Sequence, residues 1–261
     1  MIAVGIKTFL RDKSLLRLLD SVENSLPENR IYIADDGRSS LKKTFVFDNL
    51  IKNGHKVITL PFDSGISKGR SEILKNVKED FYLNLDDDFE ITEKLPIQEL
   101  IDILNREPNL AFISGTTLNM RDWKGKLLDK PAINQLCLDF EIKDRILRQI
   151  VPDKGFKQYG KIKYKYADFT SFFFLGKTKA IREIGWGDYN VGIVHPDFSL
   201  RVKQSKWQGA FTPDFKISHH MDKMDEEYMN YRLRYDINKL LDKWKLKDAF
   251  YPDGKSWKDL R

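Results

Sequence analysis

Two clusters of acidic residues have the types and spacing to bind a cation. Asp35–Gly37 and Asp86–Asp88 each follow an apolar run of strand length. Adjacent carboxylates repel one another unless a cation or hydrogen-bond donors offset their charge. A divalent ion such as Mg²⁺ or Mn²⁺, bound through oxygen and bridging to a diphosphate, would supply that offset. The alternative is a solvated acidic turn in which Asp88 caps a helix, and the cluster alone does not decide between the two.

A glycine-containing turn, Gly65–Arg70, lies between the two clusters in the sequence. Its glycines allow the backbone to approach a ligand, and a helix N-terminus together with Lys68 and Arg70 favours anions. The spacing differs from that of a P-loop or a dinucleotide-binding fingerprint, and such a turn taken alone is more often only a turn. Beside an acidic cluster that could hold a metal, it indicates a site for a nucleotide diphosphate.

The elements that must position these residues alternate along the first part of the chain. Strands are expected at 2–6, 31–34, 57–60, 81–85 and 110–114, and helices at 15–22, 41–51, 73–77 and 97–104. This alternation is typical of β-α-β units and predicts an α/β fold with one mostly parallel, Rossmann-like sheet flanked by helices. Ligands bind beyond the carboxyl ends of such strands, where both acidic clusters lie.

The second half of the chain has a less regular pattern. We expect helices at 139–150, 177–184 and 197–205, extended segments at 164–175, 209–211 and 215–218, and a helical tail at 226–245. No repeat or linker separates the halves, so we expect the second half to complete the same sheet. The predicted organisation is one domain over residues 1–220, with a nucleotide-binding half (1–115) and an acceptor half (116–220). A C-terminal helical tail (221–261) would pack on this domain or on a partner subunit, so a homodimer is one option.

Composition excludes several classes of protein. With 41% hydrophobic residues among 261, the chain can bury a sizeable core, which argues against disorder as its main state. No apolar run approaches the roughly 20 residues of a membrane span, and the first residues lack the features of a signal peptide. A single cysteine, Cys137, excludes an intrachain disulfide or a multi-cysteine zinc site. We therefore expect a soluble protein of the cytoplasm.

The motifs, taken in their order, resemble a known family. Val4–Phe9, Ala34–Gly37, Gly65–Arg70 and Leu85–Asp88 occur in the order seen in family 2-type glycosyltransferases of the GT-A fold. Further segments resemble the ganglioside-type β-1,4-N-acetylgalactosaminyltransferases and their microbial relatives, and these are Pro61–Arg70, Asp168–Thr178, Ile181–Gly185 and Asp214–His219. The resemblance covers roughly residues 1–220. It implies a GT-A fold and a metal-dependent, inverting transfer of a sugar from a UDP-sugar to a hydroxyl of a glycan.

The resemblance also implies a nucleotide pocket. Thr8 and Phe9, at the end of the first strand, would line the uridine site together with Asp35 or Asp36. In that pocket a carboxylate accepts a hydrogen bond from the N–H of the base. Arg70 corresponds to the arginine that lies near the nucleotide and the aspartate-rich motif.

A metal site is implied beside the nucleotide. Asp86 would face the ribose and Asp88 the metal, and Asp87 has no settled role because three acidic residues fill the motif. His219 corresponds to a metal ligand from the second half of the fold. An imidazole beside carboxylates suits Mn²⁺, with Mg²⁺ as the other option. The alternative for His219 and its neighbour His220 is a pair on the surface.

The residues that we expect on the acceptor side lie in the second half of the chain. Asp197 resembles the family's catalytic base, although the family often has Glu-Asp where this chain has Pro196-Asp197. Its alternative role is as an N-cap of the following helix. Asp168 is a second acidic candidate, which we group with the residues that bind the nucleotide-sugar. His195 and Trp186 could contact the acceptor, since sugars stack on aromatic faces, although a structural histidine and a core tryptophan are the alternatives.

Positive charge is concentrated in residues 141–165. The whole chain carries +6, and this segment holds eight basic and three acidic side chains, an excess of five, with aromatic residues interleaved. This composition is typical of a surface for phosphates or nucleic acid, although we favour a solvated, lysine-rich surface. Two other functions therefore stay open. One is a glycosyltransferase that acts on modified DNA or another polyanion. The other is a non-catalytic module that binds a sugar-nucleotide or a glycan, suggested by the incomplete Glu-Asp pair.

Overall fold

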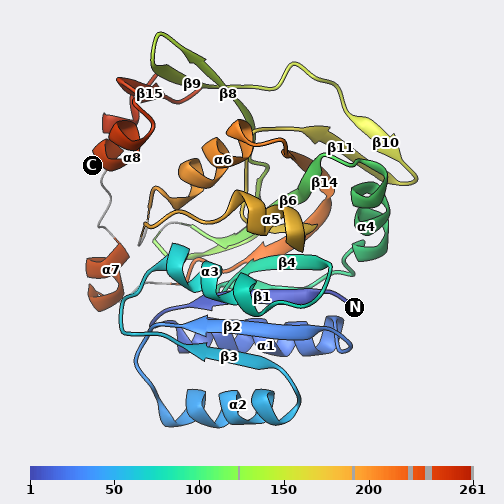
Figure 1. The fold of residues 1–261 in the computed structure, drawn as a ribbon. Coiled ribbons are helices and arrows are strands. Elements are labelled where there is room, and N and C mark those ends of the chain that lie inside the picture. Colours follow the sequence, from blue (N-terminus) through green and yellow to red (C-terminus); the bar gives the residue numbers. More distant parts are fainter. Residues whose placement is uncertain (123, 190–191, 223–225, 233–236, 260–261) are drawn as a thin grey trace.

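The structure, a computed structural model, describes residues 1–122, 124–189, 192–222, 226–232 and 237–259 (Figure 1). Among these residues, one sheet of eleven strands has the main strand order β10-β11-β14-β6-β13-β4-β1-β2-β3. In the same part of the chain, no helix is long and apolar enough to cross a membrane.

The first half forms the parallel part of this sheet. Strands β1 (Ala3–Thr8), β2 (Arg30–Asp35), β3 (Lys56–Thr59) and β4 (Phe81–Asp86) pair in parallel in the order β4-β1-β2-β3. Helices α1 (Asp12–Ser25), α2 (Leu41–Lys52) and α3 (Ile66–Asn76) form crossovers. The alternation predicted from the sequence is thus confirmed. In the register, Lys7 faces Asp86 on one side and Thr8 faces Asp35 on the other, so three strand ends meet at one edge.

The second half completes the same sheet, as predicted. Strand β13 (Phe174–Lys177) runs antiparallel between β4 and β6 (Leu110–Arg121), and β14 (Gln208–His219) pairs in parallel with β6. Further antiparallel pairs are made by β5 (Phe89–Glu90), β7 (Leu127–Asn134), β10 (Lys157–Tyr159) and β11 (Ile162–Tyr166). The pair of β5 with β14 sets Phe89 opposite His219, which brings the end of β14 beside Asp88.

The sheet is covered on both faces. Core residues of α1, α2 and α4 (Ile97–Arg106) pack with Val4 and Ile6 on one face. Those of α3, α5 (Thr178–Ile184) and α6 (Val194–Gln204) pack with Ala3 and Tyr82 on the other. Successive residues of β1 therefore serve opposite faces, as the period of a strand requires. In Figure 1, α1 lies behind the sheet and α3 in front of it.

A second sheet of four strands was not expected. It has the order β12-β8-β9-β15, formed by β12 (Phe169–Thr170), β8 (Cys137–Lys143), β9 (Ile146–Ile150) and β15 (Asp248–Phe250). The helix predicted over 139–150 is wrong, because this segment is the β8–β9 hairpin. Its turn places Asp144 and Arg145 at positive φ, a conformation that ends a helix and closes a hairpin.

The C-terminal segment lies against the rest of the chain. The tail predicted as one helix over 226–245 contains α7 (Glu226–Arg232) and α8 (Ile237–Lys243), while 233–236 lie outside the described residues. Leu240 and Leu241 of α8 join an apolar cluster with Phe140, Leu200 and Trp257. Trp257 belongs to a short 3-10 helix, η1 (Trp257–Asp259). This cluster joins α6, α8 and the small sheet.

Candidate active site

The carboxyl ends of β1 and β4 bring together residues that the sequence placed in one site. The hydroxyl of Thr8 donates a hydrogen bond to Asp87 Oδ2 at 2.8 Å. Asp87 and Asp88 form the turn between β4 and β5, so the alternative in which Asp88 caps a helix is wrong. Both carboxylates are buried, which makes compensation of their charge a requirement of the fold.

Arg70 lies beside this turn and is only 2% exposed. Its Nη2 donates to Asp86 Oδ1 at 2.5 Å, and its guanidinium lies over the rings of Phe172 and Trp186 at 4.5 and 4.7 Å from the centroids. Among the described residues, Nε and Nη1 of Arg70 have no hydrogen-bond partner. A buried guanidinium with unused donors can bind an oxyanion strongly.

Arg11 supplies the positive charge that the acidic turn needs, although it was not among the predicted site residues. Its guanidinium lies 3.1 Å from Asp87 Oδ1 and 2.6 Å from Asp88 Oδ2. Burial by itself would raise the pKa of Asp88, but Arg11 and then His219 outweigh it and hold that pKa well below its usual range. For Asp87, burial dominates over Arg11 and raises the pKa. The only signal in the sequence was a cation three residues after Thr8.

His219 reaches the same turn from the end of β14. Its Nε2 lies 3.0 Å from Asp88 Oδ2, and its Nδ1 lies 2.9 Å from Asn119 Oδ1 on β6. Burial lowers the pKa of His219, but the contact with Asp88 outweighs this and leaves the pKa raised. His220 instead pairs with Glu90 at 2.5 Å. The alternative of a surface pair of histidines is therefore wrong for His219.

Asp88 and His219 are the residues that could hold a metal. They offer a carboxylate oxygen and an imidazole nitrogen 3.0 Å apart, a donor set that suits Mn²⁺. The described residues contain no group of three or more His, Cys, Asp or Glu side chains arranged around a metal. The protein would thus supply two ligands, with oxygens of a diphosphate and water as the others. Arg11 lies against the Asp88 carboxylate, so a metal bound there must displace it.

The first acidic cluster is already paired with lysines. Asp35 accepts from the N–H of Gly37 at 2.8 Å and lies 3.0 Å from Lys43 Nζ. Asp36 accepts from Lys7 Nζ and, at 2.7 Å, from the N–H of Gly65. This last bond ties the end of β2 to the start of α3, where φ of Gly65 is +91° and a side chain would be strained. Both aspartates thus lie at the predicted edge and also hold the loops there.

Aromatic side chains gather above the same edge. Phe9, predicted for the nucleotide pocket, lies 5.4 Å from Phe62 and 5.3 Å from Tyr231, measured between ring centroids. Phe62 and Tyr231 are 5.4 Å apart, and Tyr228 lies 6.4 Å from Phe9. We call these four residues the aromatic cluster. Both tyrosines come from α7, so the C-terminal segment contributes to this end of the site, which no pattern in the sequence indicated.

Asp197 is fully buried in the first turn of α6. Its Oδ2 accepts from Arg201 Nε at 2.8 Å, while its Oδ1 accepts from Trp244 Nε1 at 2.9 Å and lies 3.0 Å from Lys243 Nζ. The N-cap of α6 is Ile193, so the alternative of Asp197 as an N-cap is wrong. The C-terminal segment therefore covers the predicted base.

Comparison with known proteins agrees with this geometry. The sequence profile of glycosyl transferase family 2 matches residues 3–185, more than half of the chain. The chain belongs to glycosyl transferase family 2. This is the family that the order of the motifs predicted.

Individual relatives support the same family. Human β-1,4 N-acetylgalactosaminyltransferase 1 is 27% identical over 206 residues, which are 77% of this chain and 35% of that protein. Mouse β-1,4 N-acetylgalactosaminyltransferase 2 is 28% identical over 138 residues, or 53% of this chain and 25% of that protein. The chain thus spans between a quarter and about a third of the length of these relatives. The crystal structure of S. aureus TarS 1-349 shares the fold, with a TM-score of 0.53 at 14% identity over 84% of this chain and 60% of that one.

Trp186 and His195, the two residues predicted to contact the acceptor, have other surroundings than expected. Trp186 is 6% exposed, and its ring stacks on Phe198 at 4.4 Å between centroids while Arg70 covers it at 4.7 Å. This is the arrangement of a core tryptophan and not of the acceptor wall that we expected. His195 is half-buried, and its ring centroid lies 3.6 Å from that of Phe172, beside the same core.

Asp168 also makes structural contacts. Its carboxylate accepts from the N–H of Phe140 at 2.8 Å and from Lys203 Nζ at 2.7 Å. These contacts join the small sheet to α6 and do not reach the Asp86–Asp88 turn, so the grouping of Asp168 with the nucleotide-binding residues is corrected. The pattern of the sequence could not show this, because the partners lie 28 and 35 residues away.

The basic segment 141–165 is spread over β8 to β11. Several of its cations serve internal contacts. Arg145 Nε donates to the carbonyl of Lys245 at 2.7 Å, and Lys157 Nζ lies 2.9 Å from Glu107. Such pairs fit the surface role that we favoured, and binding of nucleic acid stays a prediction.

Proposed function

We propose that this glycosyltransferase transfers a sugar from a UDP-sugar to a hydroxyl of a glycan, with inversion and with help from a divalent metal. The observation that carries the proposal is the acidic turn at the sheet edge beside Arg70, a buried cation with two unused donors among the described residues. A diphosphate would satisfy both Arg70 and the acidic turn. Its oxygens can accept hydrogen bonds from a guanidinium and can bind a cation that carboxylates hold.

The donor would lie along the carboxyl ends of β1, β2 and β4. Phe9 and Phe62 offer ring faces to the uracil, and Asp35 offers an acceptor for its N–H if Lys43 shares that carboxylate. Asp88 and His219 would hold Mn²⁺ or Mg²⁺. The names of the relatives specify N-acetylgalactosamine, so UDP-N-acetylgalactosamine is the first donor to test.

The reaction requires a base opposite the diphosphate. A bound metal would stabilise negative charge on the leaving diphosphate. Asp197 would take the proton of the acceptor hydroxyl while its oxygen bonds to the anomeric carbon and the bond from that carbon to the diphosphate breaks. Attack in line with the departing group inverts the anomeric centre. Since Lys243 and Trp244 cover Asp197, they must release it before an acceptor can reach it.

Calorimetry with UDP and a panel of UDP-sugars tests the donor site. We expect UDP to bind in the presence of Mn²⁺ and binding to weaken at least about tenfold in Asp88→Ala, because a ligand of the metal is lost. In Asp197→Asn, UDP binding should persist while transfer and slow hydrolysis of the donor fall by about 100-fold or more. UDP binding that ignores both Mn²⁺ and Asp88→Ala would contradict the proposal.

A second candidate function is a non-catalytic module that binds a sugar-nucleotide. The burial of Asp197 under Trp244 favours it, because an enclosed carboxylate cannot accept a proton from an acceptor. The two functions differ in one measurement. Hydrolysis of a UDP-sugar that depends on Asp197 supports the enzyme, whereas tight binding of UDP-sugar without any turnover supports the module.

A further inference from the structure

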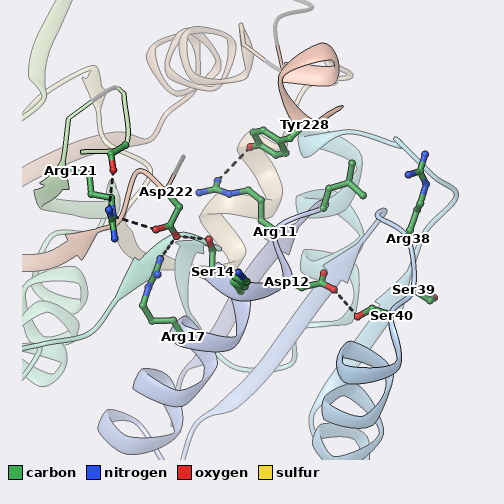
Figure 2. Close-up of a pocket in the computed structure, with 13 residues that line it drawn as sticks. Arg11, Asp12, Ser14, Arg17, Arg38, Ser39, Ser40, Arg121, Asp222 and Tyr228 are labelled. Atoms are coloured by element: carbon green, nitrogen blue, oxygen red, sulfur yellow. Dashed lines mark hydrogen bonds and ion pairs between the residues drawn. The ribbon is translucent and has the colours of Figure 1, made fainter. Parts of the chain in front are cut away.

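A pocket of about 700 Å³ opens beside the donor site, on the side of α1. Its walls come from the start of α1, from residues 38–40 and from Arg121 and Asp222 (Figure 2). Arg11 lines this pocket and also contacts Asp87 and Asp88, so its side chain separates the pocket from the acidic turn. The function proposed above does not use this pocket.

The lining of the pocket is strongly basic. Its cations outnumber its carboxylates by five to two, and they are Arg11, Lys13, Arg17, Arg38 and Arg121. One of the two carboxylates, Asp12, is engaged with Ser40 at 2.7 Å and with Lys43 at 3.2 Å. Arg38 also pairs with Glu227 at 2.6 Å, but both side chains are exposed, so solvent weakens this pair.

Asp222 shows what kind of group the pocket accepts. Its Oδ2 accepts from Ser14 Oγ at 2.9 Å and from Arg17 Nη2 at 2.8 Å, and its Oδ1 lies 3.4 Å from Arg121 Nε (Figure 2). Hydrogen bonds from Ser14 and Arg17 and an ion pair with Arg121 thus converge on one carboxylate. Arg17 Nε is buried and has no hydrogen-bond partner among the described residues, so donor capacity is left over.

The N-terminus of α1 adds to the positive potential of the pocket. Its N-cap residue is Arg11, and no side chain caps the first turn. The first N–H groups of a helix lack partners within the helix, and they carry the positive end of the helix dipole. Together with the arginines, this end of α1 favours an anion in the pocket.

We propose that this pocket binds an anionic group of the acceptor, a phosphate or a carboxylate, next to the donor site. The proposal rests on the function proposed above, which places the donor's diphosphate on the other side of Arg11. Ser14, Arg17 and Arg121 already surround one oxyanion, the carboxylate of Asp222, and an anion of the acceptor would take its place. An acceptor anchored there would lie next to the proposed donor site, because Arg11 borders both.

Titration of the full chain with inorganic phosphate at low salt tests the pocket, and titration with acetate shows whether it prefers a carboxylate. The double variant Arg17→Ala, Arg121→Ala should weaken binding of the preferred anion at least about tenfold, since bonds to charged groups are lost. Asp222→Asn should strengthen it several-fold, because the competing carboxylate is removed. Lys52→Ala with Lys56→Ala, two exposed cations at the end of α2 and on β3, is the matched control and should change nothing.

Titration with UDP and Mn²⁺ shows whether the pocket binds an anion of the acceptor or the diphosphate of the donor. Unchanged UDP affinity in the double arginine variant supports a separate acceptor pocket, whereas a loss as large as that for phosphate assigns the pocket to the donor and overturns the proposal. Failure of the wild-type chain to bind either anion also overturns it. If the double variant does not fold, Asp222→Asn decides: unchanged anion affinity overturns the proposal. If phosphate or acetate binding changes in these variants as expected but the wild-type chain does not bind UDP, the proposed function is refuted and the anion pocket stands.

Discussion

At the scale of single residues, Arg11 is the side chain that offsets the negative charge of Asp87 and Asp88. It is 12% exposed and contacts both Asp87 and Asp88, and Tyr228 lies beneath its guanidinium at 5.3 Å. A metal held by Asp88 and His219 would take over the same task. Arg11 and a divalent metal would therefore compete for the same carboxylate of Asp88.

We expect Arg11→Ala to destabilise the metal-free protein by about 3 kcal/mol, because two buried carboxylates lose their compensating charge. Addition of Mn²⁺ should restore much of this loss and should bind more tightly than to the wild type. Thermal unfolding with and without Mn²⁺ measures both effects. Lys42→Ala, at an exposed position of α2, serves as the control. A variant as stable as wild type in EDTA would show that Arg11 does not perform this role.

At the scale of elements, the C-terminal helices join parts of the site that are distant in the sequence. Helix α7 supplies Tyr228 and Tyr231 to the aromatic cluster, and the end of α8 places Lys243 and Trp244 on Asp197. In Figure 1 the two helices lie along one side of the molecule, beyond the ends of the strands. The C-terminal segment thus contacts both the predicted nucleotide pocket and the predicted base.

We expect Trp244→Phe to loosen the cover on Asp197, because it removes the hydrogen bond from the indole N–H and leaves Lys243 as the remaining contact from this segment. The cost in stability should be about 2 kcal/mol, as for a hydrogen bond to a charged group. Hydrolysis of a UDP-sugar should rise several-fold in Trp244→Phe and should not rise when Asp197→Asn is added. A fall in hydrolysis in the single variant would instead indicate that Trp244 orients the base for the reaction.

Glu107 joins the loop after α4 to strands β10 and β11. It accepts from Lys157 Nζ at 2.9 Å and from the hydroxyls of Tyr164 and Tyr166, each at 2.8 Å. These bonds, that from Lys157 first, lower the pKa of Glu107 to about 2 from an ordinary value of 4.5. Because the pKa is lowered on folding, the stabilisation is present above pH 4.5 and is lost as the pH falls toward about 2.

Glu107→Gln should remove this dependence. We expect a loss of about 1 kcal/mol at pH 7, discounted because the Lys157 side chain of the pair is 49% exposed to solvent. Urea unfolding of both proteins between pH 7 and pH 3 should show curves that converge on acidification. Parallel curves would mean that Glu107 does not titrate in this range.

At the scale of the whole molecule, the sequence predicted what depends on local patterns. Alternation of apolar runs located β1 to β4 and β6, and the motif order located the acidic turn, Arg70 and His219 at one edge. It failed for the β8–β9 hairpin, whose apolar spacing also fits a helix and whose turn depends on positive φ at Asp144 and Arg145. It also failed for contacts between distant residues. Arg11 with Asp88 and Trp244 with Asp197 are separated by 77 and 47 residues, and no local pattern records such pairs.

The central claim is that the edge formed by β1, β2 and β4 binds a nucleotide diphosphate through a divalent metal. Calorimetric titration of UDP into the full chain, with Mn²⁺ and then with EDTA, tests it most directly. We expect binding that needs Mn²⁺ and that weakens at least about tenfold in Asp88→Ala. UDP affinity that is the same with Mn²⁺, with EDTA and in Asp88→Ala would contradict it.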